Sequence, residues 1–131
     1  MGVVKVAAGL LIGMQAARTQ PSLPVLSRVP SFTLTDHEHQ PISDATLRGR
    51  VWVADFIFTR CAGQCPMMTS SLGQLVAAFH GDSSVMFVSF TVDPERDTPQ
   101  VLADYARANR VSSPQWRFVT GERDAIYQLC Q

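Results

Sequence analysis

The strongest constraint on the fold is an alternation of short apolar runs and helical patterns over residues 51–131. Three runs rich in β-branched and aromatic residues have the length and composition of buried strands. They are residues 51–58, 85–92 and 116–120. Between successive runs lie stretches long enough for a helix, as crossovers between parallel strands require. The alternation therefore predicts an α/β layered domain with parallel strands.

Each predicted helix carries its own start signal. Pro66 suits the first turn of one helix, and His80-Gly81-Asp82 ends it. Thr98 is a good N-cap for the next helix, with Pro99 at its first position. A last helix opens at residues 121–124. The apolar residues that we expect on the buried faces of the first two helices are Met68, Leu72, Leu75, Val76 and Phe79, then Val101, Leu102, Tyr105 and Ala108.

The N-terminal part of the chain differs in composition from the rest. Residues 1–17 combine one early lysine with an apolar run, which is typical of an export signal or a membrane anchor. Residues 18–30 carry three prolines and are typical of a linker. Residues 31–131 form one domain that begins with a small hairpin at 32–41. Because its sheet would end on a helix that has only begun, we expect an exposed edge strand and one poorly covered face, as in a fragment that lacks its C-terminal part.

The charge balance excludes one class of function. The 131 residues include eleven basic and eleven acidic side chains, so the formal net charge is +0 at pH 7. No field of either sign favours nucleic acid, and we exclude nucleic-acid binding. Hydrophobic residues make up 46% of the chain, which is the share of an ordinary globular protein with a core.

Cys61 and Cys65 follow the first predicted strand, at the turn into the helix that Pro66 opens. Because Pro66 disfavours helical backbone at the residue before it, we place Cys65 at the N-cap. Free N–H groups and the positive end of the helix dipole there favour thiolate over thiol. Two convergent thiolates suit a redox disulfide or a Cu(I) ion, whereas a structural zinc site would need two more ligands. A plain structural disulfide is the alternative, and Cys130 is left over as a small, half-buried apolar residue.

Other polar residues admit more than one interpretation. Asp93 and Asp97 follow the second strand, at the same sheet edge as the cysteines. They either orient a ligand or partner, or form an Asx turn with Arg96 as a local salt partner, and we favour the turn. Asp55 lies inside an apolar strand, where an unpaired carboxylate is costly, so we expect it to tune a nearby thiol. The histidines, which we interpret as incidental rather than as ligands, are His37, His39 and His80.

Four segments of the chain closely resemble the Sco/SenC/PrrC family of thioredoxin-like, membrane-anchored copper proteins. They are Phe32-Thr-Leu-Thr-Asp36, Leu47-Arg-Gly-Arg50, Phe56 to Met68 with its Cys-x-x-x-Cys-Pro motif, and Val92-Asp-Pro-Glu-Arg-Asp-Thr98. The resemblance runs from Pro30 to the end, and it implies a thioredoxin-like, three-layer α/β/α fold with an N-terminal hairpin, incomplete at the C-terminus. The chain departs from the family twice. His39 stands where relatives usually carry glycine, and the family's third copper ligand, a histidine, falls beyond residue 131.

The resemblance implies that Cys61 and Cys65 bind copper, as Cu(I) with Cu(II) as an alternative, and deliver Cu(I) to the copper centre of cytochrome c oxidase. The implied partners are the copper-bearing subunit of the oxidase, other copper chaperones or thiol reductants, and the membrane through the N-terminal segment. The implied location is the bacterial cell envelope, on the periplasmic side of the inner membrane, with the mitochondrial inner membrane as the alternative.

The main alternative function is that of a thiol–disulfide oxidoreductase that reduces the cysteines of the oxidase copper site. In that function Cys61 attacks and Cys65 resolves the mixed disulfide. Peroxidase activity is a weaker alternative, and so is a binding module in which the two cysteines form a structural disulfide.

Overall fold

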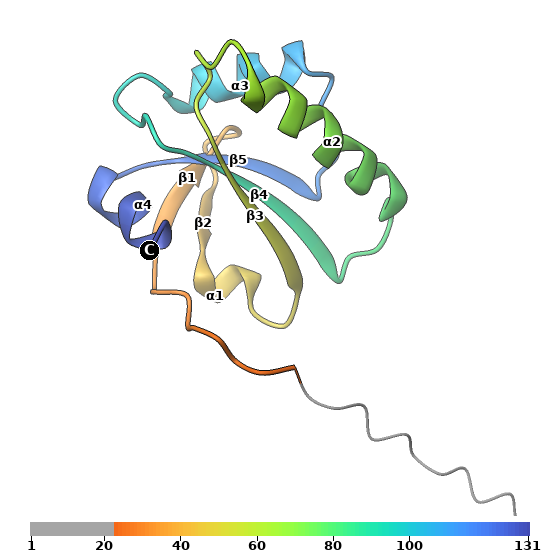
Figure 1. Ribbon diagram of the computed structural model, residues 1–131, viewed down its shortest axis with the longest axis vertical. Coiled ribbons are helices and arrows are strands. Elements are labelled where there is room, and N and C mark those ends of the chain that lie inside the picture. The colour runs from red at the N-terminus through yellow and green to blue at the C-terminus, as the bar shows by residue number, and fades with distance from the viewer. Residues whose placement is uncertain (1–22) are drawn as a thin grey trace, which may run out of the picture.

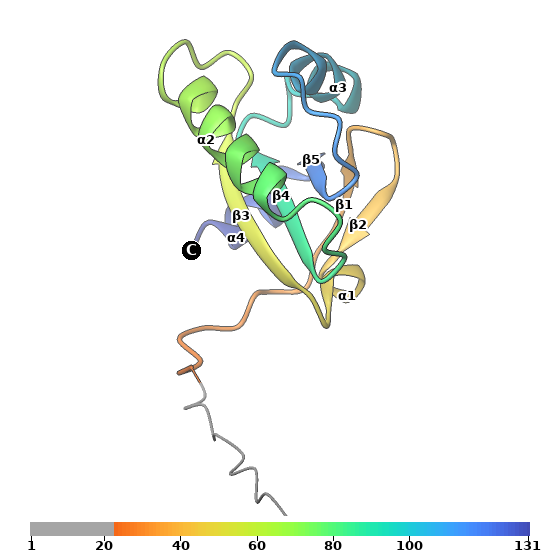
Figure 2. The same cartoon turned by 90° about the vertical axis from the view of Figure 1, so that its right-hand side faces the viewer.

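A mixed five-stranded sheet with helices on both faces forms the body of the molecule, whose residues 23–131 are described by a computed structural model (Figure 1, Figure 2). Along the chain the elements are β1 (Thr33–Asp36), β2 (Pro41–Ser43), α1 (Asp44–Leu47), β3 (Val51–Ile57), α2 (Gln64–Ala78), β4 (Val85–Thr91), α3 (Pro99–Ala108), β5 (Trp116–Thr120) and α4 (Arg123–Leu129). The strand order across the sheet is β2-β1-β5-β4-β3. The predicted α/β/α architecture with an N-terminal hairpin is confirmed.

The three strands predicted from the apolar runs are neighbours and run parallel. β3 pairs with β4 from Val51 opposite Val85 to Ile57 opposite Thr91, and β4 pairs with β5. The hairpin of β1 and β2 is antiparallel and joins the sheet through β5. Because β3 and β4 are parallel, the chain leaves both strands at the same sheet edge, which brings the cysteine turn and the turn at residues 93–97 together.

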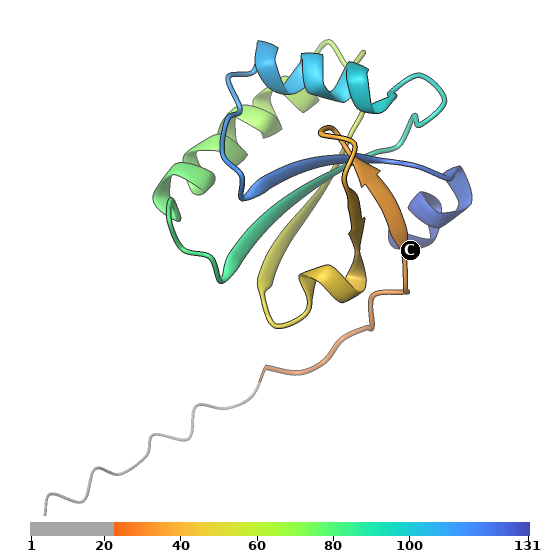
Figure 3. The same cartoon turned by 180° about the vertical axis from the view of Figure 1, so that it is seen from behind.

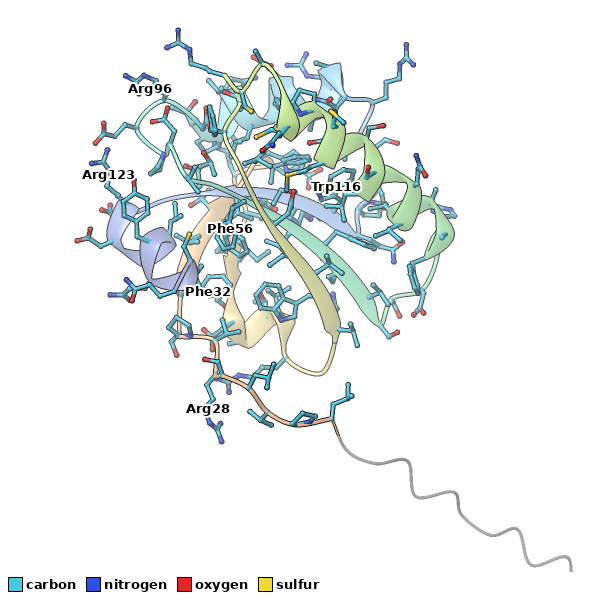
Figure 4. The ribbon with its side chains drawn as sticks, viewed as in Figure 1. Arg28, Phe32, Phe56, Arg96, Trp116 and Arg123 are labelled. Carbon is cyan, nitrogen blue, oxygen red and sulfur yellow. The ribbon has the colours of Figure 1, made fainter. Side chains whose placement is uncertain are left out.

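Two hydrophobic clusters lie on opposite faces of the sheet, because side chains alternate along each strand. α2 and α3 cover one face, where Phe118 and Trp116 are buried. α1 and α4 cover the other face, where Phe32 and Ile126 are buried. Figure 3 shows the same layers from behind, and Figure 4 shows Trp116 beneath α2 with Phe32 on the other side. Trp52 packs against this second cluster, so each face holds one tryptophan.

α2 is buried over a narrower face than its apolar pattern predicts. Its buried residues are Cys65, Thr69, Leu72 and Val76. The prediction was wrong for Met68, Leu75 and Phe79, which remain 42%, 48% and 43% exposed. The neighbouring strand β3 is an edge strand, and its Val51 is 68% exposed, as the expected open edge requires. One flank of α2 and the adjacent edge strand are therefore both open.

α3 begins where the sequence predicts. The Thr98 side chain accepts a hydrogen bond from the N–H of Val101 over 3.3 Å, and Pro99 occupies the first turn. Of the apolar residues predicted on the buried face of this helix, Leu102 is fully buried and Ala108 is exposed. Ala106 is buried in place of Ala108. The helix is therefore rotated by part of a turn from the face that the apolar residues indicate.

The hairpin turn places His39 in a backbone conformation that favours glycine. His39 has a φ of 61°, in the left-handed region that glycine enters without steric cost. The turn is held by Asp36, whose Oδ1 accepts hydrogen bonds from the N–H groups of Glu38 and Gln40 over 2.9 and 2.8 Å. His39 is therefore the residue of this turn that carries backbone strain.

The segment that enters the domain has no regular structure. Residues 23–30 are exposed and form neither helix nor strand. Within residues 23–131 no helix combines the length and the apolar character needed to cross a membrane. The export signal or anchor predicted at residues 1–17 lies outside the described residues.

Candidate thiol and metal site

The cysteine pair lies where the chain leaves β3 and enters α2. The helix starts at Gln64 with Gly63 as its N-cap, so Cys65 is the second helical residue and its predicted place at the N-cap was wrong. The extended backbone expected before Pro66 does not occur, because the first N–H groups of a helix have no partner inside it and a proline fits there without losing a hydrogen bond. As a result Cys65 faces the core and is 6% exposed, whereas Cys61 is half-buried.

The backbone around Cys61 stabilises its thiolate. The N–H of Cys65 donates to Cys61 Sγ over 3.4 Å. This hydrogen bond, with a second from the N–H of Gly63 and a third from the Cys65 thiol, lowers the pKa of Cys61 from its ordinary value of 9.0 to about 7. Burial raises the pKa of Cys65, and the neighbouring Cys61 sulfur adds to that rise. Near neutral pH the pair therefore consists of one partly ionised, accessible sulfur and one protonated, buried sulfur.

Asp97 anchors the loop that leads to the cysteines. Its side chain is 1% exposed, and its carboxylate accepts three hydrogen bonds. Thr59 donates from its backbone N–H over 3.0 Å and from its hydroxyl over 2.5 Å, and the Thr91 hydroxyl donates over 2.6 Å. Because Thr59 is two residues before Cys61, this carboxylate fixes the start of the cysteine loop.

The two acids of the turn at residues 93–97 therefore have different roles. Asp93 pairs with the exposed Arg96 over 3.2 Å, which is the local turn contact that the sequence predicts. The link from Asp97 to the cysteine loop was missed. Thr59 lies 38 residues away in the chain, and only the parallel pairing of β3 and β4 brings it opposite Asp97.

A chain of polar side chains runs under α2 on the face that carries the cysteines. Asp55 Oδ1 accepts a hydrogen bond from Ser89 Oγ over 2.5 Å, and Ser89 Oγ accepts one from Trp116 Nε1 over 2.9 Å. The other carboxylate oxygen, Asp55 Oδ2, is buried and has no hydrogen-bond partner among the described residues. Burial raises the pKa of Asp55, and its charge adds to the rise that burial causes in the pKa of Cys65. The effect has the direction expected of a carboxylate that tunes a nearby thiol.

The histidines lie away from the cysteine pair. His37 belongs to the hairpin turn, where its Nδ1 accepts a hydrogen bond from the N–H of Phe118 over 3.2 Å, and His39 follows it in the turn. His80 lies beyond the C-terminal end of α2, and that end is about 20 Å from Cys65 at the rise of an α-helix. Among residues 23–131, no three His, Cys, Asp or Glu side chains are grouped so as to hold a metal ion.

Cys130 lies apart from the other two cysteines. It caps the C-terminus of α4, which covers the opposite face of the sheet. Its side chain is exposed, so the prediction of a half-buried residue was wrong. The short helix leaves its last residue outside the cluster that buries Ile126.

A groove opens between α2 and the edge strand β3. Its volume is about 450 Å³. Asp55 lines it from β3, and Gln64, Met67, Met68, Leu72 and Leu75 line it from α2. Neither cysteine lines this groove, although Gln64 precedes Cys65 in the chain.

The fold and the site together define a thioredoxin-like thiol protein, with its cysteine pair at the first turn of the helix that follows a parallel strand. The family model described as SCO1/SenC matches residues 23–131, and the chain belongs to the SCO1/SenC family. Its curated relatives include bacterial and mitochondrial proteins.

Similarity to individual relatives covers most of this chain but only part of theirs. The SCO1 protein homolog of Bacillus subtilis is 37% identical over 99 residues, which are 75% of this chain and 51% of that protein. BsSco, described as a member of the Sco family of cytochrome c oxidase assembly proteins with a disulfide switch, has a TM-score of 0.70 at 36% identity, over 78% of this chain and 61% of its own. Bradyrhizobium japonicum ScoI, solved with copper bound, has a TM-score of 0.70 at 26% identity, over 79% and 64%. The chain spans about half the length of the first of these relatives.

Proposed function

We propose that this chain binds a Cu(I) ion as cargo through Cys61 and Cys65 and delivers it to the copper centre of cytochrome c oxidase. The observation that carries the proposal is the cysteine pair, in which the Cys61 sulfur is accessible, partly ionised at neutral pH and hydrogen-bonded to Cys65. Thiolate sulfur is a soft ligand that selects Cu(I) over hard cations. The copper-bound structure of the Bradyrhizobium japonicum relative supports the choice of metal.

The placement of the two sulfurs suits a carrier from which the ion can leave. Cys61 lies on the turn and is half-buried, so a thiolate of the receiving protein can approach the metal from its side. Cys65 is buried at the start of α2 and would release the ion last. Replacement of one thiolate at a time then passes the ion on without freeing it into water. Both cysteines must be reduced and deprotonated to bind metal, so loading releases protons and does not occur in the disulfide form.

The difference between the two thiols favours a second candidate function, reduction of the disulfide formed by the copper-site cysteines of the oxidase. The Cys61 thiolate attacks one sulfur of the partner disulfide, and the other partner sulfur leaves as a thiolate. Cys65 then loses its proton and attacks Cys61 Sγ, which forms the Cys61–Cys65 disulfide and frees the second partner thiolate. Two electrons pass to the partner, and a thiol reductant restores the pair. The disulfide switch described for BsSco supports this chemistry.

The proposed partners and location follow from the same function. We propose the copper-bearing subunit of the oxidase as the recipient, with other copper chaperones or thiol reductants as suppliers of metal and electrons. The description of BsSco as an oxidase assembly protein supports the recipient. The apolar run in residues 1–17 and the proline-containing residues 18–30 support attachment to, or export across, the membrane of the bacterial cell envelope.

Anaerobic titration of the reduced protein with Cu(I) against a competing chelator tests the copper proposal. We expect one tightly bound equivalent in the wild type and in Cys130→Ser, which removes the remote, exposed thiol, and loss of tight binding in Cys65→Ser. Tight binding retained by Cys65→Ser would refute the carrier. Multiple turnovers of a disulfide substrate by the metal-free protein, in place of stoichiometric exchange, would favour the second function.

A further inference from the structure

A cleft lies between the C-terminal half of α2 and the turn that follows α3, and its volume is about 440 Å³. Val76 and Trp116 line its apolar part, and His80, Arg110 and Ser113 line its polar part. We propose that this α2–α3 cleft binds a small organic anion, with the apolar body against Trp116 and the carboxylate or phosphate head at Arg110. Neither cysteine of the thiol pair lines the cleft, so the inference does not rest on the proposed copper function.

The α2–α3 cleft has the size and the apolar floor of a small-molecule site. Such sites have volumes of about 300–1,000 Å³ and combine apolar walls with a few polar groups. Val76 and Trp116 are 6% and 2% exposed, and Figure 4 shows Trp116 beneath α2. Both belong to the buried cluster on this face of the sheet. An apolar ligand body would therefore pack against side chains that are already held in place.

The charge of the lining favours an anion. Arg110 and His80 both line the α2–α3 cleft, whereas no Asp or Glu among residues 23–131 does. The ion pairs within the same part of the chain involve neither Arg110 nor His80. A guanidinium group presents its N–H donors in a fixed fork that matches the oxygens of a carboxylate or a phosphate. Arg110 is therefore a cation without an anionic partner at the edge of an open cleft.

The end of α3 beside the cleft does not cancel this charge. Free carbonyl groups at the C-terminus of a helix would repel an anion. Here the Tyr105 carbonyl accepts hydrogen bonds from the N–H and the side-chain amide of Asn109, over 3.0 and 2.9 Å. The Ala106 carbonyl accepts one from the N–H of Val111 over 2.9 Å. Because these carbonyls already have donors, their repulsion of a bound anion is weakened.

Two residues of the lining are unfavourable choices for the fold alone. Arg110 has a φ of 57°, the left-handed conformation that glycine or asparagine usually adopts after a helix. Gly73 lies inside α2, where alanine would be more stable. A Cβ atom at Gly73 would lie 3.7 Å from Trp116 Cζ3, an ordinary contact, so packing does not require glycine there. The missing side chain instead leaves the cleft open down to the indole ring. Both choices support a site that depends on its shape and its charge.

Titration of the full ¹⁵N-labelled chain with phenyl phosphate and with benzoate, followed by NMR, tests the proposal. We expect shifts at the indole N–H of Trp116 and at the amides of residues 108–113. Arg110→Gln should bind about tenfold more weakly, since it removes a charge-assisted hydrogen bond. Arg107→Gln is the matched control, because it makes the same change in net charge on α3, where Arg107 pairs with Asp104 and does not line the cleft. Gly73→Leu fills the floor of the cleft and should also weaken binding.

Phenol and inorganic phosphate separate the two parts of the ligand. Phenol has the apolar body without the charge, and phosphate has the charge without the body, so each should bind more weakly than phenyl phosphate. Equal binding of phenol would overturn recognition of an anion, and equal binding of phosphate would overturn the role of Trp116. The absence of shifts in the cleft with both organic anions would overturn the site itself. An equal loss of affinity in Arg110→Gln and Arg107→Gln would do the same, because the effect would then belong to the overall charge.

Discussion

Replacement of Asp97 by alanine tests whether one buried carboxylate holds the cysteine loop in place. The side chain accepts hydrogen bonds from the Thr59 N–H, the Thr59 hydroxyl and the Thr91 hydroxyl. Hydrogen bonds to charged groups contribute about 1.5–3 kcal/mol each. The two hydroxyls can rotate toward other acceptors, whereas the Thr59 N–H stays in place and loses its partner. We therefore expect the free energy of unfolding to fall by about 3–5 kcal/mol, less than a simple sum of three bonds.

Urea unfolding of the reduced protein, followed by circular dichroism at pH 7, measures this loss. Asp97→Asn keeps one acceptor oxygen and should lose about 1–3 kcal/mol. Asp93→Ala is the matched control from the same turn, because it removes only the pair with the exposed Arg96, which is worth about 0.2–1 kcal/mol. Domains of this kind have a free energy of unfolding of about 5–15 kcal/mol, so the loss in Asp97→Ala can be large enough to prevent folding. In that case Asp97→Asn is compared with Asp93→Ala instead. Losses of equal size in the Asp97 and Asp93 variants would refute the reasoning.

Three other residues yield predictions that need one variant or one pH series. With a pKa of about 7, Cys61 should react with iodoacetamide at a rate that is half-maximal near pH 7, whereas Cys65, whose pKa is raised, should react only at higher pH. Peptide mapping measures the alkylation of each cysteine separately, and the same pH profile for both would contradict the predicted difference in pKa. Burial raises the pKa of Asp55, so the stability it contributes at low pH is lost as the pH rises above the ordinary value of 3.8. Asp55→Asn should therefore gain stability relative to the wild type between pH 4 and pH 7 in urea unfolding, and a difference that does not change with pH would count against this. His39→Gly should raise the free energy of unfolding by up to about 1 kcal/mol. Glycine removes the steric cost of the left-handed backbone at this position, and we expect that gain to outweigh the greater chain entropy of glycine in the unfolded state. A lower free energy of unfolding in thermal denaturation would contradict this.

The sequence predicts the strands of this fold well and the details of the site less well. The bounds of β3, β4 and β5 agree with the predicted runs to within one residue. A short run of β-branched and aromatic residues bounded by turns strongly favours a strand, which explains this agreement. Thr98 was predicted as an N-cap because capping depends on residues that are close in the chain. The position of Cys65 inside the first turn of α2 was not predicted. A residue before proline usually avoids helical backbone, but in the first turn of a helix the N–H groups have no partner inside the helix, so the proline costs no hydrogen bond there.

What the sequence leaves open depends on contacts between distant segments. The apolar residues of α2 cover more than half of its circumference, so they do not indicate which edge rests on the sheet, and Met68 proved to be exposed. The spacing of Asp93 and Asp97 does not show which of them is buried, because the donors to Asp97 come partly from the loop after β3. These contacts follow from strand pairing and become visible only in three dimensions.

The separation of the two tryptophans by the sheet has an optical consequence. Trp116, 2% exposed and stacked on Phe118, lies on the face that carries the cysteines, and Trp52 lies beside Phe90 on the opposite face. Replacing one of the two tryptophans by phenylalanine would leave a protein whose fluorescence comes from the tryptophan on one face of the sheet. Oxidation or metal loading at the thiols would alter the emission of the variant that keeps Trp116 and not that of the variant that keeps Trp52, whereas denaturation would alter the emission of both variants. The protein thus contains its own reference signal, and events at the cysteines can be distinguished from loss of the fold without an attached dye.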